Sequence, residues 1–415
     1  MDVDKLLARY RAVRSATESL AAPLGAEDQT VQSMPDVSPT KWHRAHTTWF
    51  FETFVLEPHL VDHRVFHPGF AFLFNSYYEA VGPRYPRAQR GLITRPGVEE
   101  VAAYRAHVDA AMERLLDHGV ADDPAALIEL GLHHEQQHQE LLLMDIRHVL
   151  SANPLQPAYR EPTPPSEPPM PPTPVGWFEL GGGVVEVGHA GAGFAFDNEG
   201  PRHRVWLDPF RIADRPVTCA EWCDFVDDGG YRRPELWLSD GWAAVQANGW
   251  SAPESWEPDG DGWTCFTLEG RRAVRPDEPV THVSHYEADA FARWAGARLP
   301  TEAEWEHAVE ILGTDGERTE PALHPEAAGP PGDRLRQVGT DVWEWTASSY
   351  LPYPGFRTGP GAVGEYNGKF MSGQMVLRGG AAITPVGHTR STYRNFFPPA
   401  ARWLMGGLRL AGDPA

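Results

Sequence analysis

Two histidines near the middle of the chain have the spacing of a metal site on a helix. Residues 124–150 show helical periodicity, and within them His134 and His138 lie four positions apart. At about 3.6 residues per turn, both side chains project from the face that carries Leu127 and Leu142. Two imidazoles on an apolar face are costly to bury without partners, and one metal ion satisfies both. The alternative is a pair of core histidines held by hydrogen bonds.

A second expected helix offers a third ligand. The sequence Ser-Pro-Thr at 38–40 is typical of a helix start, with the Ser as N-cap and the Pro in the first helical position. The helical pattern continues to about Glu57. His46 lies on the face that also carries two tryptophans, whereas His43 lies off that face. We therefore expect His46 to join the pair, and the alternative is a core histidine packed against tryptophan.

The same pair of histidines also fits a zinc-protease pattern. In the pattern His-Glu-x-x-His the Glu, here Glu135, is the general base. The extended form with a further His is absent, because Leu141 and Met144 occupy its places. Glu161 stands where some such enzymes keep a third ligand, but its Pro-rich surroundings do not favour a helix. The protease stays open as an alternative.

Composition and charge narrow the class of protein. The 415 residues suffice for two domains, and 57 acidic against 36 basic side chains give a net charge of −21. Such a charge argues against nucleic acid or an anionic membrane as a partner. No signal peptide and no apolar run of membrane-spanning length are visible, so we expect a cytoplasmic protein. Three Cys are too few for a disulfide framework in a chain of this size.

The expected elements divide the chain into two domains and a linker. Helices are expected at 3–22, 38–57, 98–118 and 124–150. Four such helices make an up-down bundle, which can hold a metal between facing helices. Residues 59–96 lack periodicity, and loops of that length are often functional. A Pro-rich stretch predicts an extended linker at 153–175, between a bundle at 1–152 and a second domain at 176–415.

The sequence of the second domain predicts an irregular α+β fold. Short apolar runs alternate with loops rich in Gly, Asp and Trp. Helices are expected around 219–226 and 286–295. Thr301 with Glu304 has the pattern of a capping box that starts a third helix.

Six motifs are spread along the whole chain. They are SPTKWHRAH at 38–46, HEQQH at 134–138, ARLPTEAEWE at 297–306, VWEWT at 342–346, LRGG at 377–380 and YRNFFPP at 393–399. Together they resemble the EgtB-like non-haem iron sulfoxide synthases of ergothioneine biosynthesis. Those enzymes join a DinB-like four-helix bundle to a formylglycine-generating-enzyme-like domain of C-type-lectin-like fold. The resemblance implies the same fold class here, an α bundle followed by an α+β domain.

The resemblance implies an iron enzyme. Fe(II) would be held by His46, His134 and His138, with O2 as co-substrate. Three neutral imidazoles on one face of an octahedral ion leave positions free for O2 and substrates. Zinc fits the same ligands, but it has no redox chemistry and would not activate oxygen.

The resemblance also implies where two substrates bind. One is hercynine, the trimethylated betaine of histidine. Gln137 and Asn395 match residues that hold it, and Phe396 stands where relatives place an aromatic ring over the quaternary ammonium. Arg87 and Arg90 match a pair that grips the carboxylate of the thiol donor, a task suited to bidentate guanidinium groups. A surface Gln and a core Phe are the alternatives at 137 and 396.

Two adjacent tyrosines are the candidates for the proton source. Tyr77 and Tyr78 match a pair that one branch of the family has near the iron. A phenol there can give a proton or an electron and so favour carbon–chalcogen bonding over thiol oxidation. Alternatively, one of the two only packs against the second domain.

The chain departs from the family at positions that contact the donor. Relatives that use γ-glutamylcysteine carry an acid and a base where this chain has Phe397 and Ala401. The cysteine-using branch commonly has Ser-Cys and Cys-Asn pairs where this chain has Ala381-Ala382 and Ser372-Gly373. Smaller side chains indicate a roomier pocket, and the related selenoneine synthases couple hercynine to a selenosugar. We therefore favour carbon–selenium bond formation at imidazole C2 of hercynine, in selenoneine biosynthesis.

Three other functions stay open on the sequence. The first is a hercynylcysteine sulfoxide synthase with cysteine or γ-glutamylcysteine as donor. The second is a zinc-dependent thiol transferase, because DinB-like bundles also host that chemistry. The third is a lectin-like binding module whose bundle metal is structural.

Overall fold

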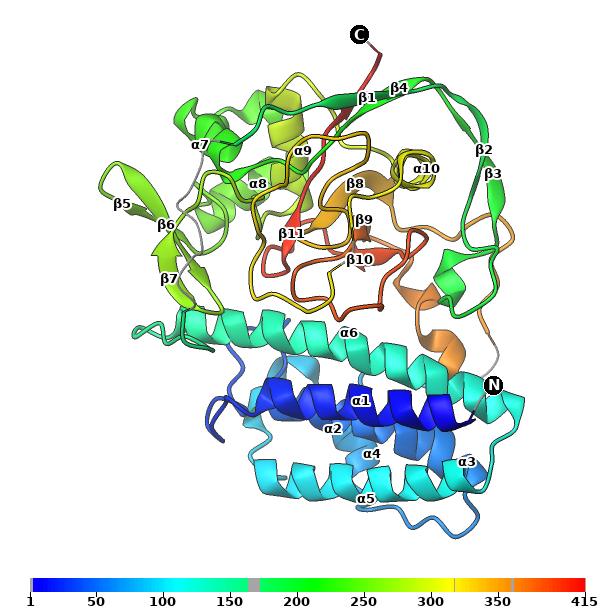
Figure 1. Ribbon diagram of the computed structural model, residues 1–415. Helices are drawn as coiled ribbons and strands as arrows, with labels where there is room; N and C mark the ends of the chain where they lie inside the picture. The colour runs from blue at the N-terminus through cyan, green and yellow to red at the C-terminus, as the bar shows by residue number, and fades with distance from the viewer. Residues whose placement is uncertain (1–2, 163–171, 317, 360–361, 415) are drawn as a thin grey trace. The chain divides into compact units, whose positions relative to one another are not determined.

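The structure, a computed structural model, describes residues 3–162, 172–316, 318–359 and 362–414 (Figure 1). The chain forms two compact units. The first comprises Met1–Arg160 together with Gly359–Tyr366, and the second comprises the remaining residues. The centre of the expected linker, residues 163–171, lies outside the described residues.

Four long helices form the first unit. They are α1 (Val3–Ala21), α2 (Thr40–Phe51), α5 (Val98–Asp117) and α6 (Asp122–Ala152). The four run alongside one another, with α6 packed against both α1 and α2, and α2 against α5 (Figure 1). Each helix turns an apolar face inward, as the periodicity predicts. The expected helical bundle is therefore confirmed.

Helix α2 differs from its expected bounds at both ends. Pro39 is the N-cap residue rather than the first helical residue, because its ψ of 143° is extended, and the Ser38 side chain makes no cap. The α-helix ends at Phe51 and widens into a π-helix, η1 (Glu52–Leu56), followed by a short α3 (Glu57–His59). π-Turns within helices frequently lie at functional sites.

The connection between α3 and α5 has little regular structure, as predicted. It contains only α4 (Phe70–Phe74) and a 3₁₀ turn, η2 (Arg87–Leu92). The Asn75 side chain fixes the turn that follows α4: its Nδ2 donates to the Tyr78 carbonyl at 2.9 Å, and its Oδ1 accepts from the Tyr78 N–H at 3.0 Å. This turn places Tyr77 and Tyr78 next to the bundle.

In its described residues, the second unit combines small sheets with four α-helices. The largest sheet has the order β10-β9-β8-β11, with β8 antiparallel to β9 and parallel to β11. Its strands are β8 (Trp343–Ser349), β9 (Met375–Gly379), β10 (Asn395–Phe397) and β11 (Gly406–Gly407). A second sheet orders β1 (Trp177–Leu180), β4 (Phe210–Ala213) and β12 (Ala411–Gly412). A third sheet pairs β2 (Gly183–Val187) with β3 (His203–Leu207). A fourth sheet joins β5 (Trp256–Asp259), β6 (Gly262–Thr267) and β7 (Gly270–Ala273).

Three of the four helices in this unit were expected. They are α7 (Cys219–Asp227), α9 (His285–Trp294) and α10 (Glu302–Leu312). Thr301 caps α10 with Glu304 in the predicted reciprocal box, its Oγ1 accepting from the Glu304 N–H at 3.1 Å. The unexpected helix, α8 (Ser239–Asn248), buries only Gly241 and Val245 and so lacks a strong apolar stripe.

A buried ion pair lies at the centre of the second unit. Glu344 on β8 and Arg409 are fully buried and joined by two bonds of 2.8 and 2.9 Å, and Trp305 donates to the same carboxylate at 2.7 Å. All three Cys are free. Among the helices in the described ranges, none combines the length and apolar character needed to span a membrane.

Candidate metal centre

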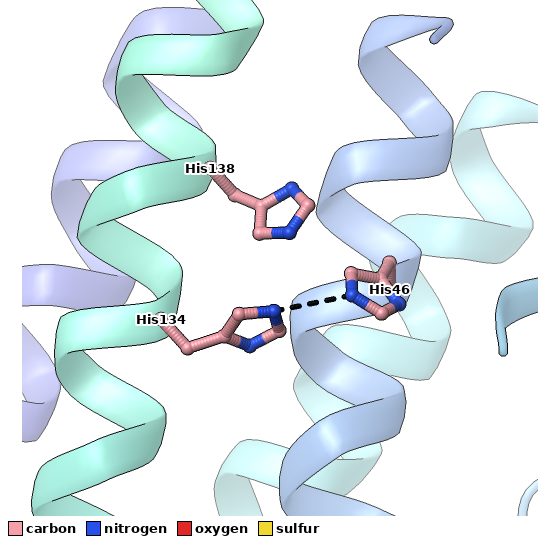
Figure 2. A group of neighbouring side chains, drawn as sticks. All are labelled: His46, His134 and His138. Atoms are coloured by element: carbon pink, nitrogen blue, oxygen red, sulfur yellow. Dashed lines mark hydrogen bonds between the residues drawn. The ribbon is translucent and has the colours of Figure 1, made fainter. Parts of the chain in front are cut away.

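Three histidines converge between two helices of the bundle. His46 on α2 meets His134 and His138 on α6, and one ring nitrogen of each lies within 4.8 Å of the others (Figure 2). The Nε2 atoms of His46 and His134 are 3.2 Å apart. His46 is fully buried, His134 nearly so, and His138 is partly exposed. The structure thus brings together the three residues singled out as metal ligands.

The outer nitrogen of His46 is held by the backbone. Its Nδ1 lies 2.6 Å from the carbonyl oxygen of Phe74. A carbonyl only accepts, so Nδ1 carries the proton and Nε2 keeps a lone pair. That lone pair faces His134 at 3.2 Å.

His138 is held by a relay of side chains. Asp145 Oδ2 lies 3.0 Å from His43 Nε2, and His43 Nδ1 lies 2.8 Å from His138 Nδ1. With the single ring proton of His43 on Nε2 toward the carboxylate, its Nδ1 accepts in turn from the Nδ1–H of His138. This leaves the lone pair of His138 on Nε2. Such outer partners orient metal-binding histidines and fix their tautomer. His43, placed off the inward face by the sequence pattern, is therefore a partner of the centre.

The electrostatics keep the three rings neutral. Burial lowers the pKa of His134 to about 3, and burial followed by the neighbouring imidazoles lowers the pKa of His46 and His138 well below the ordinary value. Metals bind the neutral ring, since the coordinating nitrogen must be free of a proton. Two unprotonated Nε2 atoms and a third imidazole within a few ångströms fit a divalent transition metal.

The Glu135 carboxylate bonds two arginines and a threonine rather than the three histidines. Its carboxylate is fully buried, accepts from Arg14 and Arg105 at 2.9 Å each, and accepts from the Thr17 hydroxyl at 2.7 Å. Burial raises its pKa, but the two guanidinium charges outweigh burial and lower it to about 2. A carboxylate held in this way cannot act as a general base near neutral pH. This geometry argues against the zinc-protease interpretation.

A segment far along the chain reaches the same centre. The Tyr366 hydroxyl donates to the side-chain oxygen of Gln137, and its ring centroid lies 5.6 Å from that of His134. Glu365 accepts from the backbone N–H groups of Glu79 and Ala80 at 3.1 and 2.8 Å. Sequence reasoning missed Glu365 and Tyr366, because no periodicity or spacing links them to residues more than 200 positions earlier.

Tyr77 and Tyr78 lie beside this segment. Their rings are 4.5 Å apart and their hydroxyls 3.4 Å apart, and Tyr77 lies 6.4 Å from the ring of Tyr366. Tyr78 is fully buried against Trp49 and Phe54, whereas Tyr77 is only partly buried. Burial, then the charge that Tyr77 would carry, raises the pKa of Tyr78. Tyr77 is therefore the more accessible phenol of the pair, whereas Tyr366 is buried at 6% exposure.

Arg90 is built into the wall of the centre. It is nearly fully buried, with its guanidinium 3.4 Å from the ring centroid of Trp42, which in turn stacks on His46 at 4.6 Å. Its two terminal nitrogens donate to the hydroxyls of Ser38 at 2.9 Å and Ser76 at 3.1 Å. Its Nε has no partner within the described residues.

The other predicted substrate-binding residues, Arg87, Asn395 and Phe396, lie in environments that differ from that of Arg90. Arg87 is exposed on η2, so it does not share the burial of Arg90. Asn395 and Phe396 belong to the second unit, on β10, and the Asn395 side chain accepts from the Phe396 N–H at 2.9 Å. The ring of Phe396 stacks on Tyr350 at 4.0 Å and lies 5.8 Å from Phe370.

Comparisons with known proteins cover nearly the whole chain. It is 35% identical to the hercynine oxygenase of Mycolicibacterium smegmatis, with 92% of each chain covered. It is 34% identical to that of Mycolicibacterium thermoresistibile, over 91% of this chain and 88% of the relative. The family described as "Sulfatase-modifying factor enzyme 1-like domain" matches residues 166–328. A formylglycine-generating enzyme of Streptomyces coelicolor is 40% identical over 32% of this chain and 46% of its own length.

Proposed function

This chain belongs to the hercynine oxygenase family, and on that premise we propose that it joins hercynine to a chalcogen donor in an O2-dependent reaction. The family places it among the oxidoreductases, as the EgtB-like motifs predicted. The observation that carries the proposal is the convergence of His46, His134 and His138, with outer hydrogen bonds that leave lone pairs on the inner nitrogens of His46 and His138.

We propose Fe(II) as the resident metal, held by the three histidines. When bound, iron would supply the one-electron chemistry that O2 activation requires and that zinc lacks. The hydrogen bonds from His46 to Phe74 and from His138 through His43 to Asp145 keep the ligand rings oriented before the metal arrives.

The proposed reaction balances as follows. Imidazole C2 of hercynine loses its hydrogen, the donor loses its Se–H or S–H hydrogen, and a C2–Se or C2–S bond forms. One oxygen atom of O2 ends on the chalcogen and the other, with both hydrogens, in water. We propose that Tyr77 and Tyr366 hold or deliver a proton beside the centre, and the carboxylate of Glu365 bonds the segment that carries Tyr366 to the backbone at 79–80.

Four further residues are proposed to bind the substrates. Gln137, Asn395 and Phe396 would contact hercynine, with the face of Phe396 toward the quaternary ammonium. For the donor, Arg90 is preferred over Arg87, because its fixed guanidinium lies against the ring that stacks on His46.

For the donor itself we propose a selenosugar. Phe397 and Ala401 offer no charge pair for the glutamyl group of γ-glutamylcysteine; Phe397 packs edge-on against Trp403, and Ala401 is buried. Ala381 and its neighbour bring methyl groups rather than the hydroxyl and thiol of cysteine-using relatives. The competing donors are cysteine and γ-glutamylcysteine.

Two measurements test the proposal. Oxygen uptake by Fe(II)-loaded protein should require hercynine and donor together, whereas uptake that does not depend on hercynine would contradict it. Full activity of zinc-loaded protein without O2 would instead favour the thiol transferase. Mass spectrometry of the product formed with selenosugar, cysteine and γ-glutamylcysteine in competition then identifies the donor, and a product that contains only sulfur would refute the selenosugar.

A further inference from the structure

A second group of potential metal ligands lies in the helical bundle. Glu52 begins the π-helix after α2, His63 follows in the loop, and His107 lies on α5. One ligand atom of each lies within 4.8 Å of the other two. A carboxylate and two imidazoles are a ligand set that zinc and related divalent metals bind. None of these residues belongs to the three-histidine centre.

Glu52 is a buried carboxylate with little compensating charge. It is 2% exposed, and it accepts from the Tyr104 hydroxyl at 2.6 Å and the Phe66 N–H at 3.0 Å. Among the described residues its ion-pair partner is His63, at 3.2 Å, and no Arg or Lys pairs with it. Glu135, buried as deeply, has two arginines. A carboxylate removed from water is costly without a cation beside it.

The two histidines retain nitrogens that can bind a metal. The His63 side chain is 2% exposed, and its buried Nδ1 has no partner within the described part of the chain. His107 donates from Nε2 to the Arg64 carbonyl at 2.8 Å, which leaves a lone pair on its Nδ1. The two rings are 5.7 Å apart.

We propose that Glu52, His63 and His107 bind a divalent transition metal, zinc in the first instance. The ion would neutralise the buried carboxylate and take one ligand nitrogen from each imidazole. It would also clamp the loop at 60–69 to the end of α2 and to α5. That loop leads into α4, whose Phe74 carbonyl orients His46. The proposal does not depend on the function assigned to the chain.

The test is metal stoichiometry of the full chain after chelation and reloading with Zn²⁺. We expect two bound ions per chain in the wild type and one in His107→Ala, whose partly exposed side chain can be removed without opening the core. The double variant His134→Ala/His138→Ala should also keep one. His59→Ala, which removes an exposed histidine from α3, is the matched control and should keep two. A wild type that binds one ion, or a His107→Ala protein that binds two, overturns the proposal.

A second variant, Glu52→Gln, separates the loss of a metal ligand from the loss of folding. Glu52→Gln removes the charge at nearly the same shape: its amide oxygen can accept from the Phe66 N–H while its amide N–H donates to the Tyr104 hydroxyl oxygen, and its circular dichroism should match the wild type. With Co²⁺ in place of zinc, the visible absorption of the second equivalent should be lost in both Glu52→Gln and His107→Ala. Retention of that absorption in folded Glu52→Gln would overturn the assigned ligand set.

Discussion

The relay from Asp145 through His43 to His138 makes a graded prediction for metal affinity. Asp145 Oδ2 accepts both from the Ser38 N–H at 2.7 Å and from His43 at 3.0 Å. In Asp145→Asn the amide oxygen must face the Ser38 N–H, so the bond to His43 survives but loses its charge. In His43→Ala the bond to His138 is lost altogether, and Asp145 keeps a buried charge without its imidazole.

The two variants should therefore weaken metal binding to different extents. Loss of an outer partner typically weakens metal binding about 10- to 100-fold, or about 1.4–2.7 kcal/mol. We expect Asp145→Asn near the lower limit, about tenfold, because only the charge of the hydrogen bond is removed. His43→Ala should lie near the upper limit, about a hundredfold, because the His138 ring loses its only fixed proton acceptor in the relay.

The assay is competition for Zn²⁺ or Fe(II) against a chelator of known affinity, with folding checked by circular dichroism. Asp109→Asn is the matched control, since that carboxylate bonds Tyr10 and Arg14 in the same bundle at 2.7 Å each without contacting the histidines. The control should bind the centre's metal as the wild type does. Wild-type affinity in His43→Ala, or equal weakening in Asp109→Asn, would refute the relay.

Substitutions of three other side chains should change stability or turnover. Glu135→Gln should lower the free energy of unfolding by about 3 kcal/mol, since two buried guanidinium groups lose their shared carboxylate. The pKa of Glu135 is about 2 in the folded protein against an ordinary 4.5. The stabilisation by its ionised carboxylate is therefore present above pH 4.5 and is lost as the pH falls toward 2. Denaturant titration at several pH values measures this loss. Arg90→Lys should raise KM for the donor about tenfold more than Arg87→Lys, because Lys lacks the planar fork that stacks and bonds at position 90. Glu365→Gln should lower kcat about tenfold with hercynine affinity changed little, because the amide accepts from only one of the two backbone N–H groups and so releases Tyr366.

Each of these has a control or a refuting outcome. Glu113→Gln, which removes an exposed ion pair with Arg11, should leave the free energy of unfolding almost unchanged, and an equally small effect of Glu135→Gln would contradict the buried network. Equal KM values for the two arginine variants would remove the distinction between their positions. An unchanged kcat in Glu365→Gln would show that the bonds of Glu365 do not position a group needed for turnover.

The sequence alone determined the features that depend on neighbours along the chain. A spacing of four places His134 and His138 on one helical face, and the Thr301–Glu304 box starts a helix, because both depend on backbone geometry within one or two turns. Pattern and motif together predicted the bundle, the mixed second domain and the family.

Only the tertiary structure decided which groups meet. Periodicity gives the face on which a side chain lies but not the element packed against that face, so the pattern does not assign His43 to the centre although it bonds His138. For the same reason, spacing alone did not show that Glu135 turns toward Arg14 and Arg105 rather than toward the histidines. Tyr366 reaches Gln137 across 229 residues of sequence, a contact fixed by long-range packing rather than by local pattern.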